Sequence, residues 1–129
     1  MHIASRFAER KHATLPALAS ILIVSGDDGI KLRATNLETG IDLKVSGESV
    51  QDGVVAIPAT ILQQIASSLS GEGLVRMEHA GDTVTISTGS SKSLIKTTPH
   101  EDFPVIPMPE TSQDSISIPG HTLRAVLSA

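Results

Sequence analysis

The side chains of this 129-residue chain that could hold a metal ion or transfer a proton are widely separated. Its five histidines are His2, His12, His79, His100 and His121. No two of them have the His-x3-His spacing by which paired imidazoles bind one zinc ion. The adjacent carboxylates Asp27-Asp28 and Glu101-Asp102 lie in turn-like contexts, where such side chains hydrogen-bond the backbone. We therefore expect no metal site and no catalytic pair of carboxylates.

Motifs of nucleophilic and phosphate-binding chemistry are also missing from the sequence. Serine is abundant, but no Gly-x-Ser-x-Gly elbow and no Gly-x-x-x-x-Gly-Lys loop occurs. The chain has no cysteine, which excludes disulfides and thiolate metal sites and is compatible with the cytoplasm. We expect a cytoplasmic protein without a cofactor, and nothing in the sequence favours an enzyme.

A short basic stretch near the N-terminus is the one concentration of charge. The net charge is −4, yet Arg6, Arg10 and Lys11 stand close together and are opposed only by Glu9. Helical spacing of apolar and basic residues over 2–11 predicts a helix with a basic face. Such an element on an acidic body can still approach phosphate groups.

The remaining pattern alternates short apolar strands with few helices, which predicts an α+β fold with antiparallel meanders. We expect strands over 20–25, 30–36, 41–47, 54–58, 74–79, 83–88 and 92–98, and a helix over 59–69. Residues 99–113 hold four of the seven prolines and no periodicity, which predicts a linker.

One sequence motif of 15 residues occurs twice in the chain. Residues 54–68 read VVAIPATILQQIASS and residues 115–129 read SISIPGHTLRAVLSA. Ile57-Pro58 matches Ile118-Pro119 at a spacing of 61, and both copies predict a strand followed by a helix. A period of this length is typical of a supersecondary unit.

Four motifs in order resemble a known family. They are Thr14-Leu15-Pro16 before the strand SILIV, LRATNLE at 32–38, Ile57-Pro58-Ala59 opening a helix, and PHEDFP at 99–104. From about residue 3 to its end the chain resembles the first domain of the bacterial DNA polymerase III beta subunit, the sliding clamp. The internal repeat supports the resemblance, because each clamp domain contains two similar units.

The resemblance implies the sliding-clamp fold and a division of the chain. Residues 1–109 would be the clamp's N-terminal domain, and 110–129 a linker with the first strand and helix of the central domain. Family members begin with a strand and most of a helix ahead of the position of Ser5. We therefore expect that strand to be missing and one apolar sheet edge to be unpaired.

The resemblance also implies a function. Clamps are rings of two chains that encircle duplex DNA without reading its sequence and tether DNA polymerase III. They are processivity factors without a catalytic site, and their pocket for polymerase and clamp-loader peptides lies in domains beyond this stretch. The resemblance assigns DNA contacts to Arg6, Arg10, Lys11 and His12. The alternative for these residues is a solvated helix face without a role.

In this family the ring closes head to tail between two chains. Motif alignment places Ile65, Leu69, Lys92, Ser93 and Ile95 at that contact. Apolar residues at a sheet edge beside a basic one suit strand addition flanked by ion pairs. For Ile65 and Leu69 the alternative is packing in the chain's own core, where apolar helix stripes are usually found.

Two other functions stay open. The chain could be an α+β binding module that shares only a strand pattern with clamps. It could instead be a non-catalytic piece of a larger enzyme.

Overall fold

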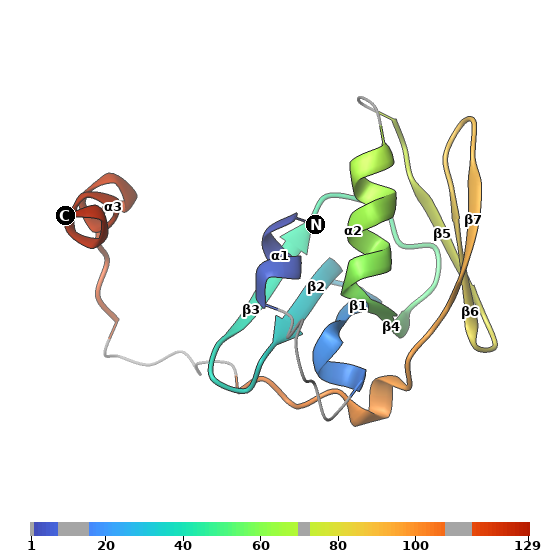
Figure 1. Cartoon of the computed structure of the whole chain (residues 1–129), viewed down its shortest axis with the longest axis horizontal. Coiled ribbons are helices and arrows are strands. Elements are labelled where there is room, and N and C mark those ends of the chain that lie inside the picture. Colours follow the sequence, from blue (N-terminus) through green and yellow to red (C-terminus); the bar gives the residue numbers. More distant parts are fainter. Residues whose placement is uncertain (1, 8–15, 70–72, 108–114) are drawn as a thin grey trace.

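The computed structural model describes residues 2–7, 16–69, 73–107 and 115–129, which form an α+β fold (Figure 1). Its elements are α1 (His2–Phe7), η1 (Pro16–Ala19), β1 (Ser20–Gly26), β2 (Gly29–Thr35), β3 (Gly40–Val45), β4 (Gly53–Pro58), α2 (Ala59–Ser68), β5 (Arg76–Ala80), β6 (Thr83–Ser87), β7 (Lys92–Lys96), η2 (His100–Asp102) and α3 (Gly120–Ser128). None of the helices in these ranges is long and apolar enough to span a membrane. The predicted helix over 2–11 is described only as far as Phe7.

The strands form two antiparallel sheets. Sheet A has the order β3-β2-β1-β4, and sheet B has the order β5-β6-β7. Both sheets begin with a hairpin closed by a two-residue turn, at Asp27-Asp28 in sheet A and at Gly81-Asp82 in sheet B. Gly29 and Gly81 have positive φ angles of 100° and 62°, conformations that glycine adopts without a steric penalty. The turn chemistry thereby sets the register of each sheet.

Sheet A is covered on both faces, as the unbroken apolar run of β1 requires. Ile21 and Ile23 point into the main core, whereas Leu22 points to the opposite face. In β2 the residues alternate more strictly, so Leu32 is buried while Lys31 lies on the other face. The face that contains Ile21, Ile23 and Leu32, hereafter the inner face, is the one on which α1 and α2 pack.

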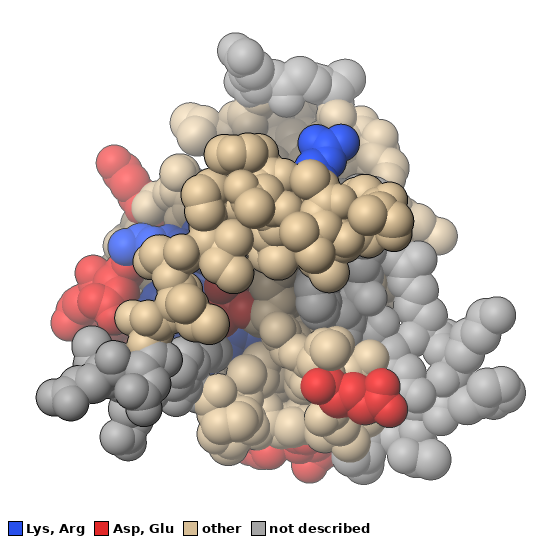
Figure 2. Space-filling model, turned by 90° about the vertical axis from the view of Figure 1, so that its left-hand side faces the viewer, with Lys and Arg blue, Asp and Glu red and all other residues tan. Residues whose placement is uncertain are grey.

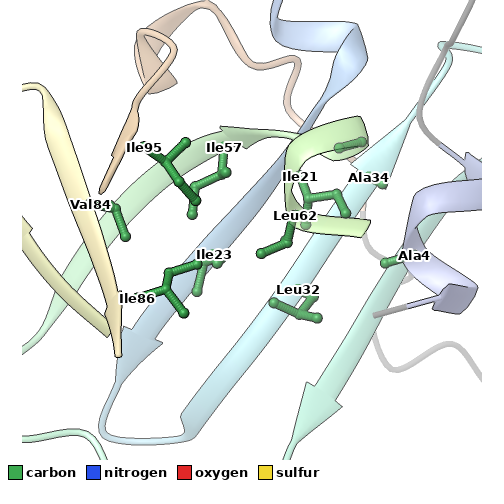
Figure 3. Close-up of a cluster of buried hydrophobic side chains, with 11 residues drawn as sticks. Ala4, Ile21, Ile23, Leu32, Ala34, Ile57, Leu62, Val84, Ile86 and Ile95 are labelled. Atoms are coloured by element: carbon green, nitrogen blue, oxygen red, sulfur yellow. The ribbon is translucent and has the colours of Figure 1, made fainter. Parts of the chain in front are cut away.

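Helix α2 brings the two sheets together at the main core. It follows Pro58 directly, and its Ala59 and Leu62 are 2% and 1% exposed. Figure 3 shows Leu62 among Ile21, Ile23 and Leu32 of sheet A, with Val84 and Ile86 of sheet B in the same cluster. Residues from both sheets and from α1 and α2 thus form one apolar cluster.

The segment after β7 is packed, which corrects the prediction of a linker over 99–113. Phe103 is only 8% exposed and joins Ala17, Leu22 and Ala56 in a second apolar cluster on the outer face of sheet A. The N–H of Thr98 donates to the carbonyl of Ala56 at 2.9 Å. An aromatic ring among the prolines therefore anchors residues 98–106, and residues 108–114 lie outside the described part.

The second copy of the repeat forms its helix but not its strand. Helix α3 follows Pro119 as α2 follows Pro58, and the two prolines have nearly the same φ and ψ, −57° and 132° against −53° and 125°. Residues 115–119 are not a strand, because no described strand lies beside them to complete a ladder. Their apolar side chains are exposed, Ile116 at 90% and Ile118 at 51%.

Candidate nucleic-acid and subunit interfaces

The N-terminal basic stretch is only partly described by the structure. Helix α1 buries Ala4 and Ser5 in the molecule and exposes Ile3. Arg6 follows this buried pair within α1, on the side of sheet A that also carries α2. Arg10, Lys11 and His12 lie outside the described residues, so their assignment to DNA stays a prediction.

The charges of sheet A lie on its outer face and are largely neutralised. Arg33 Nε is 3.2 Å from Asp42 Oδ1, and Lys31 Nζ is 3.5 Å from Asp28 Oδ2. Helix α2, on the inner face, has the sequence ATILQQIASS and carries no charge. Between them the described helices on this face, α1 and α2, therefore carry one arginine or lysine, Arg6.

The side that carries α3 offers little charge. Figure 2 looks at this side and shows mostly uncharged residues in front, with basic and acidic groups scattered around them. Within α3, Arg124 is the one arginine and no acidic residue occurs. This view shows no concentrated basic patch among the described residues.

The residues assigned to a subunit contact lie on two elements, α2 and β7. Ile65 is half-buried and packs against the main core, and Leu69 caps the C-terminal end of α2 with an extended backbone. Lys92, at the start of β7, is exposed and has no carboxylate within ion-pair distance among the described residues. Ser93 is half-buried beside it.

Ile95 lies in the core of this chain and not on the exposed side of β7, and its assignment to a subunit contact stays a prediction. Its side chain is 3% exposed and belongs to the main cluster, opposite Val84 of β6. Alternation along β7 instead exposes Leu94, at 71%. The motif alignment did not predict that Leu94 is the exposed apolar residue of β7. The alternation of Val84 and Ile86 in β6 could have indicated which residues of β7 point inward.

β7 is an edge strand whose free backbone groups can be identified from its ladder. The N–H of Thr88 donates to the Ser91 carbonyl, and the N–H of Thr97 donates to the Asp82 carbonyl. Because hydrogen-bonded and non-hydrogen-bonded pairs alternate in an antiparallel ladder, the backbone groups of Leu94 point away from β6. Among the described residues no strand covers this edge of β7, so the edge is open to pairing with a further strand.

No metal-binding cluster is seen in the described residues. No three histidine or acidic side chains in those ranges lie close enough to hold a metal ion. His79 Nε2 lies 2.9 Å from the Gly81 carbonyl of its own hairpin, and His100 Nε2 lies 3.6 Å from Glu101 Oε1. An open hollow beside the first hairpin is lined by Asp27, Glu48 and Asp52, whose charge disfavours phosphate.

Comparison with known proteins identifies the family. The family described as the DNA polymerase III beta subunit, N-terminal domain, matches residues 3–107. The chain belongs to this family. The beta sliding clamp of Synechococcus elongatus is 26% identical over 110 residues, which are 84% of this chain and 29% of that protein. The beta sliding clamp of Vibrio harveyi is 30% identical over 94 residues, 72% of this chain and 65% of that protein.

Solved clamp structures confirm the predicted sliding-clamp fold. A DNA polymerase III beta subunit from Pseudomonas aeruginosa superimposes with a TM-score of 0.83 at 26% identity, covering 98% of this chain and 34% of that one. The beta subunit from Thermotoga maritima gives a TM-score of 0.75 at 31% identity, covering 85% and 30%. The chain spans about a third or less of most of these relatives, so it corresponds to one part of a clamp.

The different positions of Leu94 and Ile95 can be tested by stability. Ile95→Asp places an unpaired carboxylate in the main core and should lower the free energy of unfolding by about 3 kcal/mol or more. Leu94→Asp changes an exposed side chain and should alter it by about 0.5 kcal/mol. Urea unfolding followed by circular dichroism measures both. Equal losses for the two variants would contradict the core position of Ile95.

Proposed function

We propose that this chain supplies the N-terminal domain of a replicative DNA sliding clamp, with residues 110–129 beginning the central domain. The observation that carries the proposal is the family match over residues 3–107 together with the two-sheet clamp fold. In the proposed assembly two chains close head to tail around duplex DNA and tether DNA polymerase III. The chain acts as a processivity factor, and its own residues perform no chemistry.

The helical side of sheet A faces the DNA in this proposal, and Arg6, Arg10, Lys11 and His12 attract its phosphates. Support comes from the position of Arg6 on α1 and from the absence of charge on α2. A ring must slide, so contacts with phosphates rather than base edges suit it. The basic groups Lys31 and Arg33 lie on the opposite, outer face of sheet A, where they are paired with Asp28 and Asp42.

The second chain pairs with the open edge of β7 in this proposal. Outward-facing backbone groups at Leu94 supply the ladder, and the exposed Lys92 meets a carboxylate of the partner. Leu69 and the end of α2 line the same contact, with Ile65 supporting it from its half-buried position. Ser93 lies along the same strand, and Ile95 acts from within the core by holding β7 in place.

Topological retention on DNA tests the function. In a chimera, residues 3–107 replace the superimposable segment of the Pseudomonas aeruginosa beta subunit, and that bacterium's loading machinery assembles it on nicked circular DNA. We expect the chimera to stay on circles and to be lost when a restriction enzyme linearises them, because a ring slides off a free end. The unaltered P. aeruginosa protein is the control. A dimeric chimera that binds linear and circular DNA equally well would contradict the proposal.

The basic stretch can be tested in the same assay. Arg10→Ala with Lys11→Ala should shorten retention and reduce the salt dependence of DNA affinity, by about 0.9 in log–log slope for each phosphate that the variant no longer neutralises. The matched control is Lys31→Ala with Lys44→Ala, which removes the same charge from the outer face of sheet A. Retention and salt slope are measured by filter binding between low and moderate salt. Equal effects of the two double variants would assign the loss to net charge alone.

The edge of β7 can be tested by proline. Leu94→Pro in the chimera removes an outward-facing N–H but no bond to β6, so the fold should persist while the ring opens. Sedimentation velocity should show a shift from dimer toward monomer, and Leu94→Ala, which keeps the N–H, is the control. A Leu94→Pro dimer as tight as the control would move the subunit contact away from this edge.

A further inference from the structure

The loop between β2 and β3 contains a leucine in an unusual backbone conformation. Thr35 pairs with Gly40, so the loop consists of residues 36–39. Among the described residues, Leu37 is the one residue other than glycine with a positive φ angle, 75°. A residue with a Cβ adopts this conformation at a steric cost, which glycine avoids and asparagine tolerates. Leucine is therefore not the residue type that the turn itself favours at this position.

Hydrogen bonds within the loop hold Leu37 in this conformation. The carboxamide oxygen of Asn36 accepts from the N–H of Glu38 at 3.1 Å and from the N–H of Thr39 at 2.8 Å. The hydroxyl of Thr35 accepts from the N–H of Leu37 at 3.1 Å and donates to the Thr39 carbonyl at 2.8 Å. Because these bonds fix the backbone on both sides of Leu37, the loop is organised for a contact before any partner binds.

The side chain of Leu37 contributes little to the core of this domain. It is 66% exposed, and neither apolar cluster of the described residues includes it. Neither the turn nor the core therefore accounts for a leucine here. Backbone strain that the surrounding structure maintains is typical of a functional contact. An apolar side chain of this size stabilises such a contact by leaving water.

The path of the chain after β7 indicates the partner of this contact. Ile106 packs on Gly40, the residue that closes the loop, with its Cγ2 3.3 Å from where a Cβ would stand. The absence of a side chain at Gly40 permits this close approach, so the chain passes the loop as it leaves the N-terminal domain. In the proposed function the residues that follow lead into the central domain. A connection that starts at the loop raises the local concentration of the central domain around Leu37.

We propose that Leu37 is an apolar anchor by which the N-terminal domain contacts the central domain of the same chain. The hydrogen-bonded loop holds the leucine in place, and burial of its side chain against the central domain offsets the cost of its backbone conformation. The contact helps to set the angle between the two domains. It rests on the proposed function, because the proposed assembly supplies the central domain.

Photo-cross-linking of the chimera with the Pseudomonas aeruginosa beta subunit tests the contact. The photoreactive amino acid p-benzoylphenylalanine replaces Leu37, and irradiated protein is digested and analysed by mass spectrometry. We expect a cross-link between position 37 and the central domain within one chain, without the doubled mass of a link between two chains. The control places the same group at Val50, which is 102% exposed and lies in the loop beyond the other end of β3. The yield of this cross-link should be severalfold lower from position 50.

Substitution of Leu37 separates its backbone strain from its contact. In the 129-residue chain Leu37→Gly should not lower the urea midpoint, because relief of the positive φ offsets the loss of an exposed side chain. In the chimera the same change should raise severalfold the rate at which subtilisin cuts between the two domains. Leu37→Met, which keeps an apolar side chain, should leave that rate unchanged.

The outcomes for the contact and for the proposed function are distinct. A chimera that is retained on circular DNA but gives no cross-link from position 37 to its own central domain would overturn the anchor alone. Links from position 37 to DNA or to the second chain in place of the central domain would overturn it as well, as would a lowered urea midpoint for Leu37→Gly in the 129-residue chain. A chimera that is not retained contradicts the proposed function, whereas the cross-link still reports on the contact.

Discussion

The packing of two sheets around α2 is the constraint on which the rest of the structure depends. Leu62, at 1% exposure, shares one apolar cluster with Ile57 of sheet A and Ile86 of sheet B. The sheets are also joined directly, since Thr98 bridges to Ala56 and its hydroxyl accepts from that of Ser20 at 3.0 Å. This core fixes the helical side and the edge of β7 relative to each other. In the proposed ring such rigidity matters, because an error in the angle of the domain would be repeated at every contact.

Much of this arrangement could be predicted from local sequence because local chemistry determines it. Pro58 ends β4 and α2 begins at the next residue, which is the strand-to-helix boundary predicted from the sequence. The Gly-Asp-Asp-Gly turn closes the first hairpin, also as predicted. Each of these signals is a backbone preference of one or two residues. The order and type of the strands from β1 to β7 follow from them, whereas some bounds differ by one or two residues.

What could not be predicted depends on tertiary neighbours. The prolines of 99–107 indicated a linker, but the ring of Phe103 enters a cluster whose other members come from η1, β1 and β4. Residues 115–118 alternate like a strand, yet a strand exists only when another strand supplies its ladder. Ile95 and Leu94 are both apolar, and only the register of β7 against β6 distinguishes core from surface. The assignment of Arg10, Lys11 and His12 to DNA contact stays a prediction from the resemblance.

Repetition explains why sheet edges are the reactive features of this chain. Two copies of one unit complete each other only if each edge left by one unit is covered by a strand of another. β4 covers β1 within the chain, whereas β5 and β7 each present outward backbone groups in the described structure. Both edges are short and flanked by charged residues, Arg76 and Glu78 on β5 and Lys92 and Lys96 on β7. Such charges weaken indiscriminate pairing. They leave pairing to strands whose pattern and charge match, so specific assembly at these edges requires both a defined register and a complementary partner.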